Sequence, residues 1–94
     1  MKAYKVVQCL EQNDFDEEVL GVFTFEKLKE LGAKLVEKRE HFSEKIGKLT
    51  KEENFSNVDE LVTTLVEWDI IDAGGYFPRD MYDTLEVVEV EIED

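Results

Sequence analysis

The apolar residues change their spacing along this chain, and that change constrains the fold more than any other feature. Residues 2–10 are rich in β-forming residues, which predicts a strand with Tyr4, Val6, Gln8 and Leu10 on one face. Residues 88–93 alternate strictly between apolar and polar side chains, which is the period of a half-buried strand. Within residues 25–68, apolar side chains recur at three- and four-residue intervals, which is the period of an amphipathic helix. Strands at both ends with helices between them predict an α+β domain.

The first strand is expected to pair with a second one at Val19–Phe23, because the polar residues 11–18 between them are typical of a hairpin loop. Gly21 lies inside the second strand, where a glycine indicates a β-bulge or a close backbone contact. Pairing of the first strand with the closing strand would place the two ends of the chain side by side.

The closing strand is predicted over residues 85–93, with its later valines inward and its glutamates outward. Leu85 and Val87 have the opposite parity, which predicts a bulge or a twist near Val87. The inward residues are Val88, Val90 and Ile92, and the outward residues are Glu89, Glu91 and Glu93.

The most regular helical pattern follows Thr24, a suitable N-cap, and covers residues 25–40 with a continuation to about residue 50. Gly32 and Gly47 each cost about 1 kcal/mol relative to alanine, which predicts a kink or a split near one of them. The stripe expected against the sheet begins with Phe25, Leu28, Leu31 and Leu35.

A second helix is predicted from the break at residues 54–57 to about Trp68, with Ser56 and Asp59 in a capping arrangement. Residues 69–72 are apolar at their centre and are a candidate for a short extra strand. We therefore expect one domain over residues 1–94, in the order β-β-α-α-β. It would have a three-stranded antiparallel sheet, four-stranded if residues 69–72 pair, with two helices on one face.

The charge of the chain is distributed unevenly. Residues 1–51 hold ten acids and ten bases, whereas residues 52–94 hold fourteen acids and one base, Arg79, so the net charge of −13 belongs to the second segment. Nucleic acids and anionic membranes repel such a polyanion, so neither is an expected direct partner. The asymmetry indicates either a solvating half or a surface for a basic partner.

Few side chains suit catalysis or metal binding. Cys9 is the only cysteine and His41 the only histidine, which excludes an internal disulfide and the usual Cys/His zinc sites. The alternating acids that begin at Asp14 do not form an EF-hand, because Val19 stands where the loop needs glycine. Catalytic and phosphate-binding motifs are absent from the sequence, so we expect no enzyme and no cofactor.

No apolar stretch of the sequence is long enough to span a bilayer, and the first residues lack the apolar region of a signal peptide. A cytoplasmic protein is expected.

Two segments are candidates for binding a protein partner. The first follows Gly74-Gly75 and is rich in residue types that are enriched at interfaces, although its rings could instead cover a small core. The second is the closing strand, whose regularly spaced carboxylates could imitate a nucleic-acid backbone or simply discourage edge pairing. The candidate residues are Tyr76, Phe77, Arg79, Met81 and Tyr82 in the first segment, and Asp83, Glu86, Glu89, Glu91 and Glu93 in the second.

The opening strand, the segment VLGVFTFEKLKEL at Val19–Leu31 and the segment YDTLEVVEVEIE at Tyr82–Glu93 resemble a group of small acidic proteins from phages and prophages of Gram-positive bacteria. In that group, a short hairpin ending in GVF precedes a helix, and an acidic strand closes the chain. The resemblance implies an accessory protein that binds a host or phage protein, in some cases as an inhibitor or a nucleic-acid mimic.

These observations favour a non-enzymatic acidic module that binds a basic surface of another protein through its C-terminal half. The first alternative is a homo-oligomeric accessory protein, a dimer for example, with a self-interface made by Trp68 and the aromatic residues 76–82. The second alternative is a small enzyme or ligand-binding domain. Salt separates the first two, because binding to a basic partner weakens with ionic strength and apolar self-association does not.

Overall fold

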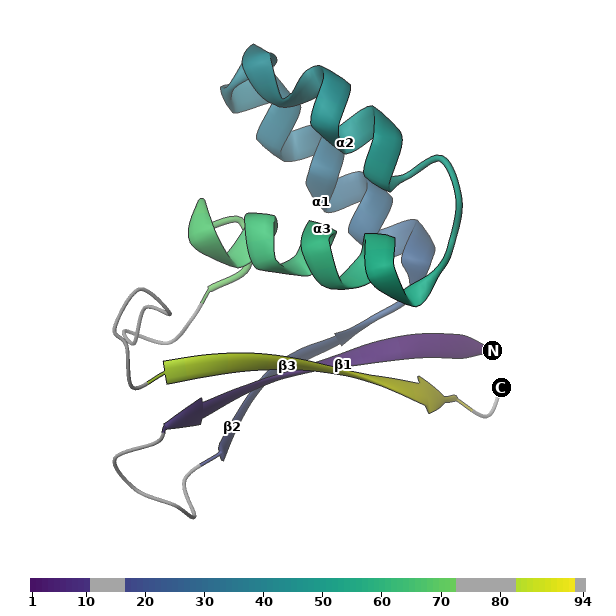
Figure 1. The fold of residues 1–94 in the computed structure, drawn as a ribbon, viewed down its shortest axis with the longest axis vertical. Coiled ribbons are helices and arrows are strands. Elements are labelled where there is room, and N and C mark those ends of the chain that lie inside the picture. Colours follow the sequence, from purple (N-terminus) through teal and green to yellow (C-terminus); the bar gives the residue numbers. More distant parts are fainter. Residues whose placement is uncertain (11–16, 73–82, 93–94) are drawn as a thin grey trace.

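A three-stranded antiparallel sheet and a layer of helices make up the fold. The computed structural model describes residues 1–10, 17–72 and 83–92 (Figure 1). The strands are β1 (Lys2–Leu10), β2 (Glu17–Phe23) and β3 (Asp83–Glu91), in the spatial order β2-β1-β3. The helices are α1 (Phe25–Lys38), the 3₁₀-helix η1 (Glu40–Phe42), α2 (Ser43–Leu49) and α3 (Phe55–Glu67), and Figure 1 shows them on one side of the sheet. The expected α+β class is confirmed.

The pairing of the central strand β1 with β3 brings the first and last described residues together. It pairs with β3 so that Lys2 lies opposite Glu91, and the Ile92 amide donates a hydrogen bond to the Met1 carbonyl at 2.7 Å. The two ends therefore lie side by side, as the pairing of the first and last strands predicted (Figure 1).

A β-bulge in β2 confirms the prediction made for Gly21. The register with β1 shifts between Val6 and Val7, which leaves Leu20 as the extra residue of β2. A Cβ atom at Gly21 would lie 2.6 Å from Cζ of Phe23, so the ring occupies the space that a side chain would need. The bulge lets Leu20 and Phe23 both pack against the core.

The parity predicted for the closing strand is wrong. Val87 is buried in the core and Leu85 packs against it, whereas Val88 is exposed. The register of β3 with β1 is continuous, so the described strand has no bulge near Val87. Directly opposite residues of antiparallel strands share a face, and Val87 lies opposite the buried Val6. This pairing turns Val88 and Val90 away from the helices.

The long helix is split, but not at a glycine, so the described residues form three α-helices instead of the two predicted. α1 ends at Lys38, and Arg39 leaves the helical conformation with φ −142° and ψ 91°. The chain then reverses through η1, and α2 packs back on α1. Gly32 is needed for this return, because a Cβ atom there would lie 2.8 Å from Cγ2 of Ile46.

Both ends of α3 correct a sequence expectation. The N-cap is Asn54, whose side chain accepts a hydrogen bond from the Asn57 amide at 2.8 Å, and Ser56 lies inside the helix. At the other end, the Ile70 amide donates to the Leu65 carbonyl at 2.9 Å and the Asp69 amide to the Val66 carbonyl at 3.2 Å. Asp69 has φ 60°, and together these features form a Schellman motif.

The Schellman motif explains why residues 69–72 are a turn and not a fourth strand. Ile71 donates its amide hydrogen to the same Leu65 carbonyl and is buried in the core, so this apolar pair anchors the end of α3. The donors that a strand would have offered to the sheet are used by the helix terminus.

The core lies between the helices and the sheet. Tyr4 and Val6 of β1 and Val87 of β3 meet the predicted stripe of α1 and the apolar residues of the other helices. Leu28, Leu31 and Leu35 are buried as expected, and Phe25 packs at the edge. The opposite surface of the sheet, here called the open face, has no described helix over it. Its described side chains are Ala3, Lys5, Val7, Val19, Val22, Glu86, Val88, Val90 and, beyond the end of β3, Ile92.

Candidate functional site

The topology separates the two halves of the sequence in space. α1 packs against β1 and β2, whereas α3 packs against β3. β2 and β3 are the two edges of the sheet, so α1 packs toward the β2 edge and α3 toward the β3 edge. Residues 52–72 and 83–92 contain no lysine or arginine. The molecule is therefore electrically polarised, with its excess negative charge on the side formed by α3 and β3.

We define the acidic side by the exposed carboxylates on α3, in the loop before α3 and on the helix-facing side of β3. On α3, the exposed residues fall on one outer stripe, because most other positions of the helix are buried. On β3, two glutamates remain exposed near the end of the strand. The acidic side consists of Glu52, Glu53, Asp59, Glu60, Glu67, Glu89 and Glu91.

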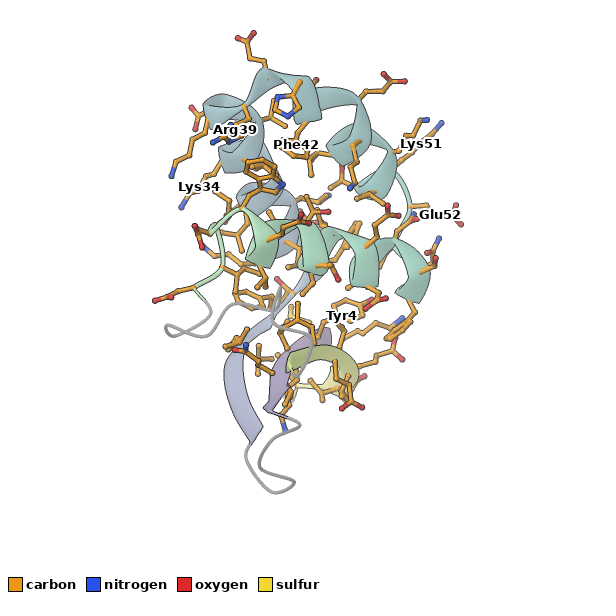
Figure 2. The ribbon with its side chains drawn as sticks, turned by 60° about the vertical axis from the view of Figure 1, so that its left-hand side comes forward. Tyr4, Lys34, Arg39, Phe42, Lys51 and Glu52 are labelled. Carbon is orange, nitrogen blue, oxygen red and sulfur yellow. The ribbon has the colours of Figure 1, made fainter. Side chains whose placement is uncertain are left out.

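Two segments far apart in the sequence meet at one end of the acidic side. The Tyr4 hydroxyl donates a hydrogen bond to Oε2 of Glu53 at 2.7 Å, and Figure 2 shows Tyr4 between the helical layer and the sheet. Glu89 lies directly opposite Tyr4 on β3. The loop before α3 and the end of β3 therefore bring their carboxylates close to the same buried tyrosine.

Positive groups at the start of β1 partly neutralise this end. Lys2 Nζ lies 3.0 Å from Oε1 of Glu89, and the Met1 amino group lies 3.0 Å from Oε1 of Glu91. The hydrogen bond and the charge of Glu89 raise the pKa of Lys2. Both carboxylates are more than half exposed, so these ion pairs are solvated and the carboxylates stay accessible to a partner.

The pKa of Tyr4 gives a pH-dependent prediction. Burial, and then the hydrogen bond and charge of Glu53, raise this pKa above the ordinary value of 10.0. An unfolded chain would lose the proton first, so the stabilisation is complete below pH 10 and is lost as the pH rises toward the folded-state pKa. We expect Tyr4→Phe to cost about 1 kcal/mol at neutral pH.

Phenolate absorbance and urea unfolding at alkaline pH test this prediction together. Of the three tyrosines in the sequence, one should ionise late, and that signal should vanish in Tyr4→Phe. Glu53→Gln keeps an acceptor oxygen but removes the charge, so it should lower the pKa of Tyr4 without abolishing the shift. Ionisation of all three tyrosines near the ordinary value in the folded protein would contradict the prediction.

The structure places some of the predicted partner-binding residues and separates them. Glu89 and Glu91 are exposed, as expected, but they share the helix-facing side of β3, and Glu86 lies on the open face. The predicted acidic track is therefore divided between two faces of the sheet. Asp83 is the first residue of β3, opposite Leu10. Tyr76, Phe77, Arg79, Met81, Tyr82 and Glu93 lie outside the described residues.

Sequence reasoning missed Lys2, Tyr4 and Glu53 as neighbours of the closing glutamates. The expected pairing of the first and last strands contained the signal for Lys2 and Tyr4, because antiparallel pairing sets the start of one strand beside the end of the other. No local pattern marks Glu53. Its position depends on where the connection to α3 crosses the end of the sheet.

Trp68 is part of the packing of the helical layer. The Arg39 guanidinium lies 4.4 Å from the centre of its ring, and the Phe42 ring meets it edge-on at 5.2 Å. Figure 2 shows Arg39 and Phe42 at one end of the helical layer, away from Tyr4. The contacts join the end of α1, η1 and the end of α3, so the ring of Trp68 packs where these helices meet.

One hollow of the described surface lies between two helices. A hollow of about 390 Å³ between α2 and α3 is lined by His41 and by charges of both signs, among them Glu44, Lys45 and Glu60. His41 is exposed and its ring lies against Phe42. Within residues 1–10, 17–72 and 83–92, no three histidine, cysteine or carboxylate side chains are grouped to hold a metal ion.

In the described part of the chain, no helix combines the length and the apolar character needed to cross a bilayer. No protein-family model matches this chain, and neither a curated protein nor a solved structure matches it.

Proposed function

We propose that this protein is a non-enzymatic binding module whose acidic side engages a basic surface of another protein. The observation that carries the proposal is the packing of α3 against β3. Both elements come from the segment with fourteen acids and one base, and their contact gathers the carboxylates that the sequence spreads over that segment. A one-sided field of this kind steers encounter with a positively charged surface.

Solvation alone would not require this arrangement. A protein that used its charge only to stay soluble would work as well with acids on every face. Here α1 carries basic residues among its acids, including Lys34 and Lys38, which are exposed. Basic residues of α2 lie next to α3, where Lys45 Nζ is 4.0 Å from Oε1 of Glu60. The contrast between the two sides gives a partner one preferred direction of approach.

A narrower form of the proposal is that the partner's basic surface normally holds nucleic acid, so that binding inhibits it. Glu89 and Glu91 are spaced by about 7 Å along β3 and the α3 stripe adds further carboxylates above them. The resemblance to phage accessory proteins leads to the same expectation. Competition between this protein and DNA or RNA for the recovered partner would separate inhibition by mimicry from binding elsewhere.

Two matched charge variants test the proposal. Glu67→Gln, Glu89→Gln and Glu91→Gln together neutralise part of the acidic side, and Glu30→Gln, Glu37→Gln and Glu44→Gln remove the same number of charges from the helices α1 and α2. Surface plasmon resonance would measure binding to a peptide rich in lysine and arginine, and then to the partner captured from the native source. We expect the first variant to associate about tenfold more slowly and with a smaller salt dependence.

The control variant should keep an association rate close to that of the unaltered protein. All six residues are exposed, so each substitution should change the stability by no more than about 0.5 kcal/mol. Equal losses in both variants would show that only the net charge matters. Unchanged association in the first variant would show that the acidic side is not the binding surface, and either result overturns the proposal.

A further inference from the structure

The open face of the sheet is an apolar surface without a cover among the described residues. Four of its aliphatic side chains are 37–53% exposed: Val19, Val22, Val88 and Ile92. A sheet with one solvated face normally alternates apolar residues toward the core with polar residues toward water. Here the described polar side chains of the open face are only Lys5 and Glu86.

The cross-strand register explains how these residues form one patch. Lys5 of the central strand lies between Val22 of β2 and Val88 of β3. In the next row, Val7 lies between Val19 and Glu86. The exposed valines therefore lie on both sides of the half-buried Lys5, and the patch reaches across all three strands. Ala3 and Val7 of the same face are buried, so the exposed apolar area comes from the two outer strands. The largest apolar patch of a monomer is often an interaction site.

We propose that the open face binds the open face of a second copy of this chain in a weak two-fold dimer. The two charges of the face support this choice of partner. In a two-fold interface, every contact occurs twice: if residue i of the first copy contacts residue j of the second, then residue j of the first copy contacts residue i of the second. A two-fold axis that passes midway between Lys5 and Glu86 brings Lys5 of each copy next to Glu86 of the other copy. The interface then contains two equivalent ion pairs, and apolar side chains surround them.

The charges are available for this pairing. Within the described residues, no ion pair of 4.0 Å or less involves Lys5 or Glu86. Glu86 is exposed at the edge strand, and Lys5 extends from the central strand. A basic partner would instead meet the unfavourable charge of Lys5 at the centre of the face. The open face therefore suits a copy of itself better than the partner proposed for the acidic side.

The size of the face predicts that the dimer is weak. Three strands spaced by about 4.8 Å and nine residues rising about 3.3 Å each give a footprint of about 400 Å² per copy. Both copies together bury about 800 Å², below the roughly 1,200–2,000 Å² of a stable interface. The net charge of −13 on each copy opposes association further. Added salt screens that repulsion, so the dimer should strengthen as ionic strength rises.

Sedimentation velocity over a series of protein concentrations, at low and high salt, tests the proposal on the full chain. We expect a reversible shift from monomer to dimer that becomes stronger at high salt. Val22→Lys should abolish it, because Val22 is exposed and its replacement puts a charge in the apolar patch. Phe55→Lys is the matched control, since Phe55 is an equally exposed apolar residue at the start of α3 and should leave association unchanged.

A charge exchange tests the identity of the partner. Lys5→Glu alone should weaken the dimer about tenfold, because it places like charges together at two positions. Lys5→Glu combined with Glu86→Lys should restore it. A protein that stays monomeric at high salt overturns the proposal. So does a dimer that survives Val22→Lys, which would use another surface, or a double variant that fails to recover association.

The two proposals fail independently. Binding of a basic partner through the acidic side weakens as salt is added, whereas association of the open faces strengthens. The variants for the acidic side leave Lys5, Val22 and Glu86 unaltered.

Discussion

Replacing Leu61 with alanine should remove about 2–5 kcal/mol from the free energy of unfolding. Leu61 lies in the middle of α3 and is fully buried. It also lies close to Gly32, since its Cδ1 would be 3.7 Å from a Cβ atom there. Truncation would open a cavity where α3 meets α1, and neither helix can move inward without losing its other contacts. Domains of this size have a total stability of about 5–15 kcal/mol, so the loss is a large part of it.

Urea unfolding measures this effect as a lower midpoint at an unchanged slope. Glu67→Ala is the matched control, because Glu67 belongs to the same helix but is exposed, and it should change the stability by no more than about 0.5 kcal/mol. A loss below about 1 kcal/mol for Leu61→Ala would mean that α3 does not pack on α1 as described.

The second large effect concerns two glycines that the sequence does not distinguish. In Gly32→Ala, overpacking of the core should cost about 1–3 kcal/mol of stability. The higher helix propensity of alanine should offset about 1 kcal/mol of that cost. The new methyl group would lie 2.8 Å from Cγ2 of Ile46, a branch atom of a buried side chain that has little room to move. Either α2 must shift away from α1 or Ile46 must adopt a strained rotamer.

Gly47→Ala should instead stabilise the protein by about 0.4–1 kcal/mol, because the added methyl group would meet nothing within 4 Å beyond its chain neighbours and the backbone of its own helix. Both substitutions gain the same helix propensity, so the difference between the two changes in stability measures the clash at Gly32 alone. Gly32→Ala combined with Ile46→Ala should cost less than the sum of the two single changes, since Ile46→Ala removes the clashing atom. Stabilisation by Gly32→Ala would show that α2 does not pack closely on α1.

Local patterns in the sequence were sufficient for most of the element positions. The β-forming residues of segment 2–10 correspond to β1, and Thr24 caps α1 by accepting a hydrogen bond from the Lys27 amide at 3.2 Å. Both features depend on neighbouring residues alone. The α+β class follows in the same way, because the change from strand to helix spacing is a local property of the chain.

The direction of the side chains of β3 could not be read locally. The segment from Leu85 to Ile92 contains two apolar sets of opposite parity, and either could face a core. The pairing with β1 selects the smaller set, because Val6 faces the helices and Val87 lies opposite Val6. The register between residues some eighty positions apart decides which side chains of β3 face the core. The local periodicity of the sequence does not contain that information.

For the candidate site too, the sequence determined one part and the tertiary structure decided the other. The sequence by itself determined that residues 52–94 carry the net charge, since a charge count needs no coordinates. Only the tertiary structure decided that these charges share one side, because α3 packs on the edge strand β3 while α1 covers β1 and β2. It also decided that Glu86 is separated from Glu89 and that valines cover the open face. Composition is a sum over residues, whereas a surface depends on which strands are neighbours and in which register they pair.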